Sequence, residues 1–369
     1  MSRTAFSAHT NSALAIEELL VGLEGSDPRV LVFFAGIHHE GGLIGRALEA
    51  RFPGARVLGC STNGEFCERG QSKGGVVAIS LSGERVGACA VAMADVGGDI
   101  RIGVSQAAER LSEQLGQPIR DLDPARWAGL VLLEGASGRE EQINAALGDV
   151  APFLPFVGGS AGDDITFSGT WTWAAGQLAR DGSALLVAEM RVPFRVFKTC
   201  HFVPTERSVV VTKAEGRMLL ELDGEPAAAA YARAIGVSPD ALDFSHFLAN
   251  PLGLMIAGEP WLRSGVRPEG EGLFFACEVV PGTRLNFMQA TDMVEDTRAK
   301  LERAAADLGA PIHGALLFNC AYRMIEAQIK GLDASYHAVL SEFVHAGAQT
   351  NGESYLGHIN QTLTGLVFA

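Results

Sequence analysis

Short apolar runs alternate with helical spacing of apolar positions through the first third of the chain. Val30–Phe34 and Gly129–Leu133 are continuous runs of aliphatic and aromatic residues, which predict buried strands. Gly42–Phe52 and Arg139–Leu147 have helical spacing, and Pro53 follows the first of them as a stop signal. The alternation indicates α/β layers in which some neighbouring strands are parallel.

Apolar runs come closer together in the following part of the chain, and helical spacing becomes rare. Val76–Leu81 and Val86–Ala92 flank a short polar turn, which predicts a paired hairpin. Successive short runs between residues 156 and 222 predict antiparallel sheet, and Pro226–Ile235 then has the features of a helix. We find no evident internal repeat or low-complexity linker in the sequence.

The chain is long enough for two domains. Its 369 residues exceed the roughly 250–300 at which single hydrophobic cores stop growing. We place the boundary between residues 223 and 224, ahead of the predicted helix, so that the domains are residues 1–223 and 224–369. The expected fold class is α/β, a mixture of α/β and α+β structure, with layered mixed sheets and helices in two closely associated domains.

Acidic residues outnumber basic ones, which narrows the choice of partners. The 29 basic and 43 acidic side chains give a net charge of −14, and Lys and Arg form no cluster. We expect binding neither to nucleic acid nor to an anionic membrane, because both need a basic face. The N-terminus lacks the apolar segment of a signal peptide, and the six scattered cysteines form no CxxC pair. These features predict a cytoplasmic protein with free thiols.

A loop rich in glycine and hydroxyl residues follows the strand predicted at Arg56–Gly59. Backbone N–H groups and side-chain oxygens bind ligands at such strand ends in α/β proteins. The candidate ligand-binding residues here are Cys60, Ser61, Thr62, Asn63 and Glu65. The alternative is a polar turn without a ligand. A Gly-x-Ser-x-Gly nucleophile elbow would need glycine where Asn63 stands, so the loop does not indicate a catalytic serine.

A second glycine-rich loop, Gly158–Asp164, follows another apolar run. It lacks the GK[ST] ending of a phosphate-binding loop, and its two neighbouring carboxylates would repel phosphate. If the loop binds a ligand, we expect Ser160, Asp163 and Asp164 to contact a cation or a molecule with donor groups. The alternative is a tight glycine turn.

Two charged residues in the last third lie beside predicted strands. Arg323 follows the apolar run Gly314–Phe318, where a guanidinium would clamp a carboxylate. Glu353 precedes the last strand, where its carboxylate would receive an ammonium group. The alternative is a salt bridge between these two side chains.

Nine histidines raise the question of a metal or haem site. None has the spacing of a metal motif such as HExxH, so we expect no metal ion. An axial haem ligand leaves no spacing signature, and the haem alternative therefore stays open at this point.

Several of these segments, in this order, resemble motifs of the FIST family. The GCSTNGE within Val57–Glu65 is similar to a signature of FIST N-terminal domains, and Val157–Asp164 resembles their second motif. The remaining similar segments are Val211–Ala214, Glu221–Ala227 with Tyr231, Leu317–Arg323, Asn351–Glu353 and His358–Thr362. The resemblance implies that residues 1–223 are a FIST N-terminal domain and residues 224–369 a FIST C-terminal domain.

The resemblance implies a bacterial intracellular sensory protein that binds a small molecule, such as an amino acid, and signals through a separate partner. Such partners are histidine kinases or cyclic-di-GMP enzymes. Because a subset of the family resembles haem proteins that sense nitric oxide, the alternative is a haem-based gas sensor with His201, His38 or His39 as axial ligand. We expect no enzymatic activity, because no base is spaced to activate Ser61 or Cys60 as a nucleophile. The identity of the ligand and the formation of a homodimer stay open.

Overall fold

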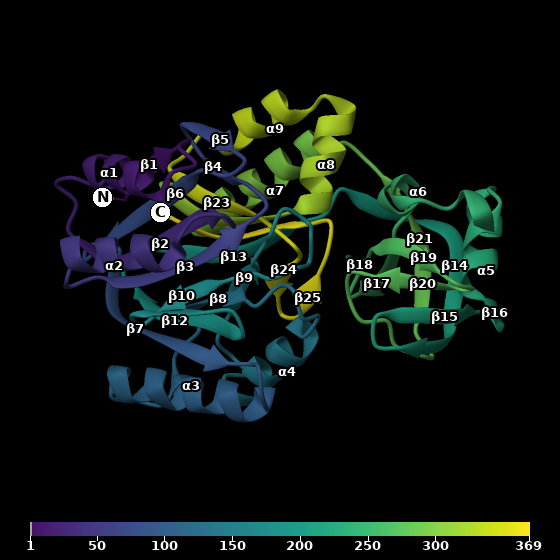
Figure 1. Cartoon of the computed structure of the whole chain (residues 1–369), viewed down its shortest axis with the longest axis horizontal. Helices are drawn as coiled ribbons and strands as arrows, with labels where there is room; N and C mark the ends of the chain where they lie inside the picture. The colour runs from purple at the N-terminus through teal and green to yellow at the C-terminus, as the bar shows by residue number, and fades with distance from the viewer. Residues whose placement is uncertain (1) are drawn as a thin grey trace.

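A computed structural model describes residues 2–369, which form a large body and a smaller lobe (Figure 1). The body contains residues 2–201 and 291–369, and the lobe contains residues 202–290. The sheets of the body mix parallel and antiparallel pairs and are covered by helices. The predicted mixed α/β fold in two domains is confirmed.

Within residues 2–369, three sheets of one design build the body. Each has six strands, with a parallel pair at its centre and two antiparallel pairings on either side. The first sheet contains, in spatial order, β1 (Arg3–Ser7), β6 (Val76–Ser82), β2 (Pro28–Gly36), β3 (Arg56–Thr62), β10 (Thr172–Ala174) and β11 (Gln177–Ala179). The second contains β7 (Val86–Asp95), β12 (Gly182–Met190), β8 (Trp127–Leu133), β9 (Phe156–Ser160), β24 (Glu353–Tyr355) and β25 (His358–Ile359). The third contains β13 (Phe194–Thr199), β26 (Leu363–Phe368), β22 (Gly314–Cys320), β23 (His345–Thr350), β4 (Glu65–Cys67) and β5 (Gly70–Ser72).

The three sheets share a central core and are covered by helices on their outer faces. Apolar side chains from all three pack together in the centre, where the rings of Phe34 and Phe318 lie 5.8 Å apart, edge to face. The first sheet packs against α1 (Ser12–Gly22) and α2 (Gly41–Arg51). The second packs against α3 (Ile100–Leu115) and α4 (Glu140–Val150), with a short 3₁₀ turn at Ile119–Asp121. The third packs against α7 (Met293–Leu308), α8 (Ala321–Lys330) and α9 (Asp333–Leu340).

Short hairpins are exchanged between the three sheets in a cycle. The hairpin β4–β5 follows β3 of the first sheet but pairs with β23 of the third. The hairpin β24–β25 follows β23 but pairs with β9 of the second sheet. The hairpin β10–β11 follows β9 but pairs with β3 of the first. The body is therefore a threefold repeat whose units interlock.

The repeat is faint in the sequence, although the loops that begin each exchange resemble one another. These loops are Gly59–Glu65, Gly158–Asp164 and Gly347–Glu353, with the sequences GCSTNGE, GGSAGDD and GAQTNGE. The expectation that the chain has no internal repeat was wrong, since the three units share one topology.

One predicted hairpin was also wrong. The strands at Val76–Leu81 and Val86–Ala92 exist, but β6 pairs with β1 and β2, whereas β7 pairs with β12 of the second sheet. The polar turn between them connects two units of the body. Strand period and turn residues predict a reversal of the chain, but they do not determine which strands then pair.

The lobe has its own sheet and core. Its strands are β14 (Phe202–Glu215), β15 (Met218–Leu222), β16 (Glu225–Pro226), β17 (Leu252–Ile256), β18 (Glu259–Arg263), β19 (Gly265–Glu269), β20 (Gly272–Phe275) and β21 (Arg284–Ala290). Its helices are α5 (Ala227–Ile235) and α6 (Phe244–Ala249), with a 3₁₀ turn at Pro239–Ala241. The predicted helix at Pro226–Ile235 is α5, with Pro226 as N-cap and Gly236 in the left-handed conformation at its end.

The lobe is inserted into the third unit of the body, between β13 and α7. The chain enters it at His201 and leaves it at Thr291, whose N–H donates to the His201 carbonyl oxygen at 2.7 Å. Phe202 and Ala290 pair in the first rung of the lobe's sheet. The expected boundary between residues 223 and 224 lies inside the lobe, at the turn between β15 and β16, and residues 291–369 return to the body.

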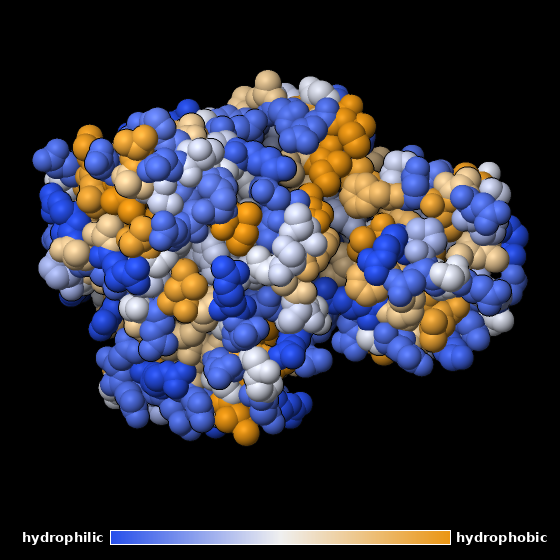
Figure 2. Space-filling model, viewed as in Figure 1, coloured by the Kyte–Doolittle hydropathy of each residue, from blue (hydrophilic) through white to orange (hydrophobic). Residues whose placement is uncertain are grey.

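The surface in Figure 2 narrows where the lobe joins the body. Apolar side chains hold this junction on one side, where Phe244 and Leu248 of α6 pack with Tyr322 and Ile325 of α8. The hydroxyl of Tyr322 also donates to the carbonyl oxygen of Gly265 at 3.0 Å. Among residues 2–369, we find no helix that combines the length and the apolar character needed to cross a bilayer.

Candidate functional site

The three repeated loops meet in the body, where Asn63 holds them together. Its Nδ2 donates to Oδ1 of Asn351 at 2.8 Å. Its Oδ1 accepts from the N–H groups of Asp163 and Ile165 at 3.1 and 3.0 Å. The structure therefore brings together the loops at Gly59–Glu65, Gly158–Asp164 and Asn351–Glu353, which the sequence singled out separately.

The main chains of these loops also bond to one another. The N–H of Gly162 donates to the Ser61 carbonyl oxygen at 2.9 Å, and the N–H of Asn63 donates to the Gln349 carbonyl oxygen at 2.9 Å. The N–H of Ser160 donates to the carbonyl oxygen of Gly352 at 2.8 Å. The side chains predicted to bind a ligand are buried here: Cys60, Ser61, Thr62, Asn63, Glu65, Ser160, Asp163 and Glu353 are all at most 1% exposed. These loops form a closed junction.

Glu65 and Glu353 occupy equivalent positions in two of the loops. The Thr62 hydroxyl donates to Glu65, and the Thr350 hydroxyl donates to Glu353 at 2.8 Å. Burial raises the pKa of Glu65 to about 7 and that of Glu353 to about 8, although these hydrogen bonds oppose the shift. Glu353 is therefore largely protonated at neutral pH, which does not suit it to receive an ammonium group.

The two aspartates of the second loop have different surroundings. Asp163 accepts from the N–H groups of Phe167, Ser168 and Gly169 at 3.1, 2.6 and 3.1 Å, so its carboxylate orders the segment that follows. Asp164 is partly exposed, and its carboxylate lies 3.6 Å from Nζ of Lys73. The contacts of Asp163 explain its burial without a ligand.

The two candidate nucleophiles are enclosed in the same junction. Burial raises the pKa of the Cys60 thiol far above its ordinary value, so the thiol stays protonated. The Ser61 Oγ accepts from the N–H of Trp171 at 3.1 Å. Neither group has the environment of an activated nucleophile. The absence of enzymatic activity stays a prediction.

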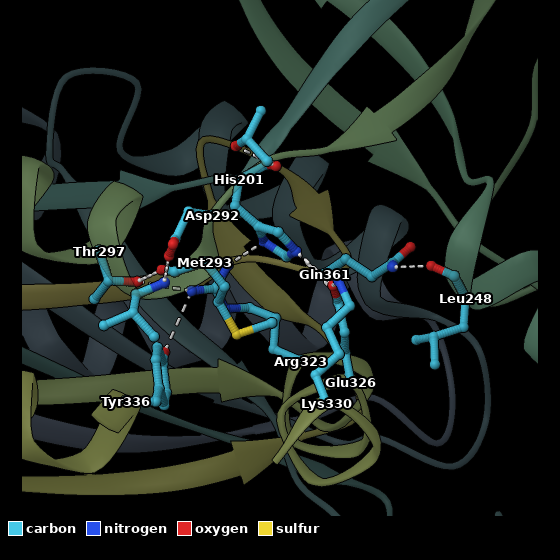
Figure 3. Close-up of polar contacts among 12 residues, drawn as sticks. His201, Leu248, Asp292, Met293, Thr297, Arg323, Glu326, Lys330, Tyr336 and Gln361 are labelled. Carbon is cyan, nitrogen blue, oxygen red and sulfur yellow. Dashed lines mark hydrogen bonds and ion pairs between the residues drawn. The ribbon is translucent and has the colours of Figure 1, made fainter. Parts of the chain in front are cut away.

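Arg323 is fully buried in a second polar cluster (Figure 3). Its guanidinium donates to Oδ1 of Asn319 at 3.2 Å, to Oγ1 of Thr297 at 2.9 Å and to Nδ1 of His201 at 2.8 Å. Glu353, by contrast, accepts from the hydroxyls of Thr350 and Thr362. The alternative of a direct Arg323–Glu353 salt bridge does not describe this arrangement.

The contacts of Arg323 determine the tautomer of His201. A guanidinium has only donors, so Nδ1 of His201 must accept and the ring proton lies on Nε2. Nε2 is 3.0 Å from both carboxylate oxygens of Glu326. The Glu326 carboxylate also accepts a hydrogen bond from Nζ of Lys330 at 2.6 Å. Burial lowers the pKa of His201, which favours this neutral form. The buried cluster thus fixes the residue at which the chain enters the lobe.

The three histidines considered as axial haem ligands do not fit that role. Both ring nitrogens of His201 are engaged, as just described. In His39, Nδ1 lies 3.0 Å from the Ser12 hydroxyl and Nε2 lies 3.2 Å from the Gly74 carbonyl oxygen. His38 is exposed, and its ring packs on that of His39 with 4.5 Å between centroids. An axial ligand needs a free ring nitrogen facing an apolar pocket, which the surroundings of these residues do not provide.

A cleft of about 430 Å³ lies where β13 and α7 of the body face the β17–β18 hairpin of the lobe. This volume falls within the range of about 300–1,000 Å³ that is usual for small-molecule sites. The body contributes Lys198 of β13 and Lys300 of α7, and the lobe contributes Ile256 and Trp261. Both parts of the molecule therefore form its walls.

Trp261 connects the two sides of the cleft. Nζ of Lys198 lies 4.9 Å from the centre of the Trp261 ring and 2.7 Å from the carbonyl oxygen of Pro260. The ring of Tyr355, from the body, lies 6.3 Å from that of Trp261 at an angle of 43°. The side chain of Lys198 is only 5% exposed, so this contact is well enclosed.

Tyr355 also connects the cleft to the loop junction. It follows Glu353 by two residues on β24, and Leu356 comes next at the tip of that hairpin. Leu356 lines the cleft, is 77% exposed and has a φ of 55°, a left-handed conformation that is strained for leucine. A molecule in the cleft would therefore touch a hairpin that starts in the junction.

Family models of FIST domains match most of this chain. The FIST N domain matches residues 29–225, and the FIST C domain matches residues 227–355. The chain belongs to the FIST family. FIST domains are sensory domains that bind small ligands, and this is the general class of the protein.

More distant similarities add little to this assignment. An uncharacterized protein of Methanocaldococcus jannaschii is 23% identical over 286 residues, which are 72% of this FIST chain and 54% of that protein. The chain thus spans about half of that relative's length. Two solved structures of cyanuric acid hydrolases, one of them from A. caulinodans, cover the whole chain at 9% identity with TM-scores of 0.39 and 0.34. The matches cover 98% and 99% of the two hydrolase chains, but similarity this low carries no argument.

Sequence reasoning identified the motif loops of this FIST protein but missed its cleft. The residues that line the cleft come from four separate segments, in β13, the β17–β18 hairpin, α7 and the tip of β24–β25. The available signal was Lys198, a lysine inside one of the short runs between residues 156 and 222 that predict antiparallel sheet. A lysine in a buried strand needs a partner or a function. Nothing in the sequence alone connects it to Trp261.

Proposed function

We propose that this FIST protein is a signal-input protein that binds a small molecule in the cleft between its body and its lobe. The observation that carries the proposal is the composition of the cleft, because Lys198 and Lys300 come from one part and Ile256 and Trp261 from the other. A ligand that contacts both parts favours one arrangement of the lobe over others, which is how binding becomes a signal.

The way the lobe is attached supports this proposal. The chain passes between the parts twice, at His201 and at Thr291, and these two crossings are hydrogen-bonded to each other. Crossings that lie side by side form a natural hinge, since few backbone angles must change. The Arg323 cluster fixes His201 on the body side and so provides a rigid base for such movement.

The output in this proposal is read by a separate partner, such as a histidine kinase or a cyclic-di-GMP enzyme. The surface that changes most when the lobe moves is the junction between the parts, where Glu141 of the body pairs with Arg217 of the lobe at 2.9 Å. Enzymatic activity is not part of the proposal, because Cys60 and Ser61 lie buried in the loop junction.

A thermal-shift screen over amino acids and other metabolites tests the proposal. A ligand present at about 100 times its dissociation constant should add about 2.7 kcal/mol to the free energy of unfolding. We expect at least one compound to raise the Tm of the wild type, and to do so less in Trp261→Ala and Ile256→Ala.

Ile102→Ala is the matched control, because Ile102 is exposed on α3 of the body and does not line the cleft. It should respond to the compound like the wild type. If no compound raises the Tm, or if Trp261→Ala responds as fully as the wild type, the proposal is wrong.

A further inference from the structure

The cleft is positively charged on an otherwise acidic protein. Its lining contains the basic residues Arg195, Lys198, Lys300 and Arg303 and the acidic residues Glu259 and Asp307. Four positive and two negative charges leave a local excess of two positive charges, whereas the whole chain has a net charge of −14. A basic cleft on an acidic protein concentrates small anions from solution.

The two lysines of the cleft share one carboxylate. Glu259 of the lobe lies 3.8 Å from Nζ of Lys198 and 3.7 Å from Nζ of Lys300. An ammonium group has three donors, and the Lys198 ammonium has one hydrogen bond at 2.7 Å, to the carbonyl oxygen of Pro260. The two lysines therefore retain N–H donors for a second carboxylate or a phosphate. A close anion of this kind would stabilise the buried cation.

The other walls of the cleft are apolar and partly aromatic. Trp261 and Tyr355 form an inclined pair of rings, and Ile256 and Leu356 flank them with exposed side chains. Inclined aromatic rings accept a flat group better than a branched one, because a flat group contacts each ring over a larger area. The cleft therefore places a site for charge beside a site for a planar group.

We propose that the cleft binds a small carboxylate or phosphate attached to a planar aromatic or heterocyclic group. Lys198 and Lys300 hold the anionic group, and Trp261 and Tyr355 pack against the planar one. The inference rests on the proposed function, since it names the class of ligand for the same cleft. The anion would compete with Glu259 for both lysines and so replace a contact between the lobe and the body.

Isothermal titration calorimetry with two pairs of probes tests this inference. The first pair is 4-hydroxybenzoate and its neutral analogue 4-hydroxybenzamide, and the second is adenosine monophosphate and adenosine. We expect at least one anion to bind tenfold or more tightly than its neutral analogue. The pair that shows this difference distinguishes a carboxylate from a phosphate ligand.

Three variants locate the binding. Lys198→Met should lower the affinity for the anion about tenfold or more. Lys300→Gln changes a half-exposed side chain and leaves the core intact, and it should lower the affinity about threefold to tenfold. Lys213→Gln is the control, because Lys213 is exposed on β14 outside the cleft, and it should leave the affinity unchanged.

The outcomes separate this inference from the proposed function. If neither anion binds at millimolar concentration, or if Lys300→Gln and Lys198→Met bind like the wild type, the anionic ligand class is wrong. If the neutral probes bind as tightly as the anions and Trp261→Ala abolishes that binding, the cleft is a ligand site for another class of molecule. If the metabolite screen also finds no ligand, both proposals fail.

Discussion

Buried carboxyl groups make the stability of this protein depend on pH in an unusual direction. Burial raises the pKa of Glu353 from its ordinary value of 4.5 to about 8. The unfolded chain therefore loses this proton at lower pH than the folded chain does. Stability from this group is fully present below pH 4.5 and falls as the pH rises towards about 8, by up to about 5 kcal/mol.

Glu353→Gln should remove this dependence, because glutamine does not ionise in either state. We expect the free energy of unfolding in urea to fall between pH 5 and pH 8 more steeply in the wild type than in Glu353→Gln. Glu17→Gln, at an exposed position on α1, should keep the slope of the wild type. Equal slopes for the wild type and Glu353→Gln would show that Glu353 is not protonated in the folded protein.

Arg323 controls the protonation of His201 in the second buried cluster. Arg323→Met leaves Nδ1 of His201 without its donor, so the free energy of unfolding should fall by about 2 kcal/mol or more. The same change removes a nearby positive charge while Glu326 remains, so the pKa of His201 should rise. NMR titration of the His201 ring measures this shift.

Arg298→Met is the control for that titration. Arg298 lies on α7 beside Thr297, but its guanidinium pairs with Glu342 near the surface, at 3.0 Å. It should leave the His201 titration unchanged. A His201 ring with the same pKa in Arg323→Met and in the wild type would contradict the tautomer assigned to this cluster.

The sequence was informative about which residues matter but not about their partners. It singled out Asn63 and Asp163 in two loops and the segment Asn351–Glu353 in a third, and the structure brings these loops together. It offered Glu353 as a partner for Arg323, yet the guanidinium contacts Thr297 and His201 instead. Contacts between residues about 120 positions apart, such as His201 and Arg323, depend on topology that local patterns do not contain.

At the scale of single elements, one helical glycine marks a close approach between a helix and a sheet, and another does not. A Cβ on Gly45 of α2 would lie 2.2 Å from Cε2 of Trp173, whose ring is fully buried. Gly148 of α4 is exposed, and a Cβ there would meet no atom within 4 Å. The two glycines therefore occupy helices for different reasons.

Alanine substitutions at these two positions should have opposite effects. Helix propensity favours alanine over glycine by about 1 kcal/mol at both. Gly148→Ala should therefore raise the free energy of unfolding by about 0.5–1 kcal/mol, whereas Gly45→Ala should lower it by about 1–3 kcal/mol because Trp173 cannot move aside. Chemical denaturation measures both. If Gly45→Ala stabilises the protein as much as Gly148→Ala does, α2 does not pack on Trp173 as described.

Most elements could be predicted, but the exchange of hairpins could not. The buried strands at Val30–Phe34 and Gly129–Leu133 are β2 and β8, because long apolar runs have few alternatives. The hairpins β4–β5 and β24–β25 have strands of only two or three residues, too short for a periodic signal. Their pairing with another unit depends on the assembled sheets.

At the scale of the whole molecule, the order of segments along the chain differs from their arrangement in space. The two family domains meet near residue 226, because the FIST N domain matches residues 29–225 and the FIST C domain matches residues 227–355. In space, however, β22, β23 and β26 from the last part of the chain complete a sheet with β4, β5 and β13 from the first part. Neither family domain therefore contains all strands of the body.

This arrangement predicts which parts of the chain fold alone. A fragment of residues 1–225 would leave β13 and the hairpin β4–β5 without their partners β26 and β23, and it would expose the apolar centre of the body. Unpaired edges of this kind promote aggregation. We therefore expect this fragment to be unfolded or aggregated in circular dichroism and size-exclusion measurements.

Removal of the lobe should be tolerated far better than this truncation. The N–H of Thr291 lies 2.7 Å from the carbonyl oxygen of His201, so a short glycine linker can replace residues 202–290 without moving β13 or α7. All three sheets of the body would keep their strands, and a cooperative unfolding transition should remain. The shortened protein should also lose binding in the cleft, because Trp261 and Ile256 leave with the lobe. If residues 1–225 instead fold cooperatively while the protein without its lobe does not, the interlocked body described here is wrong.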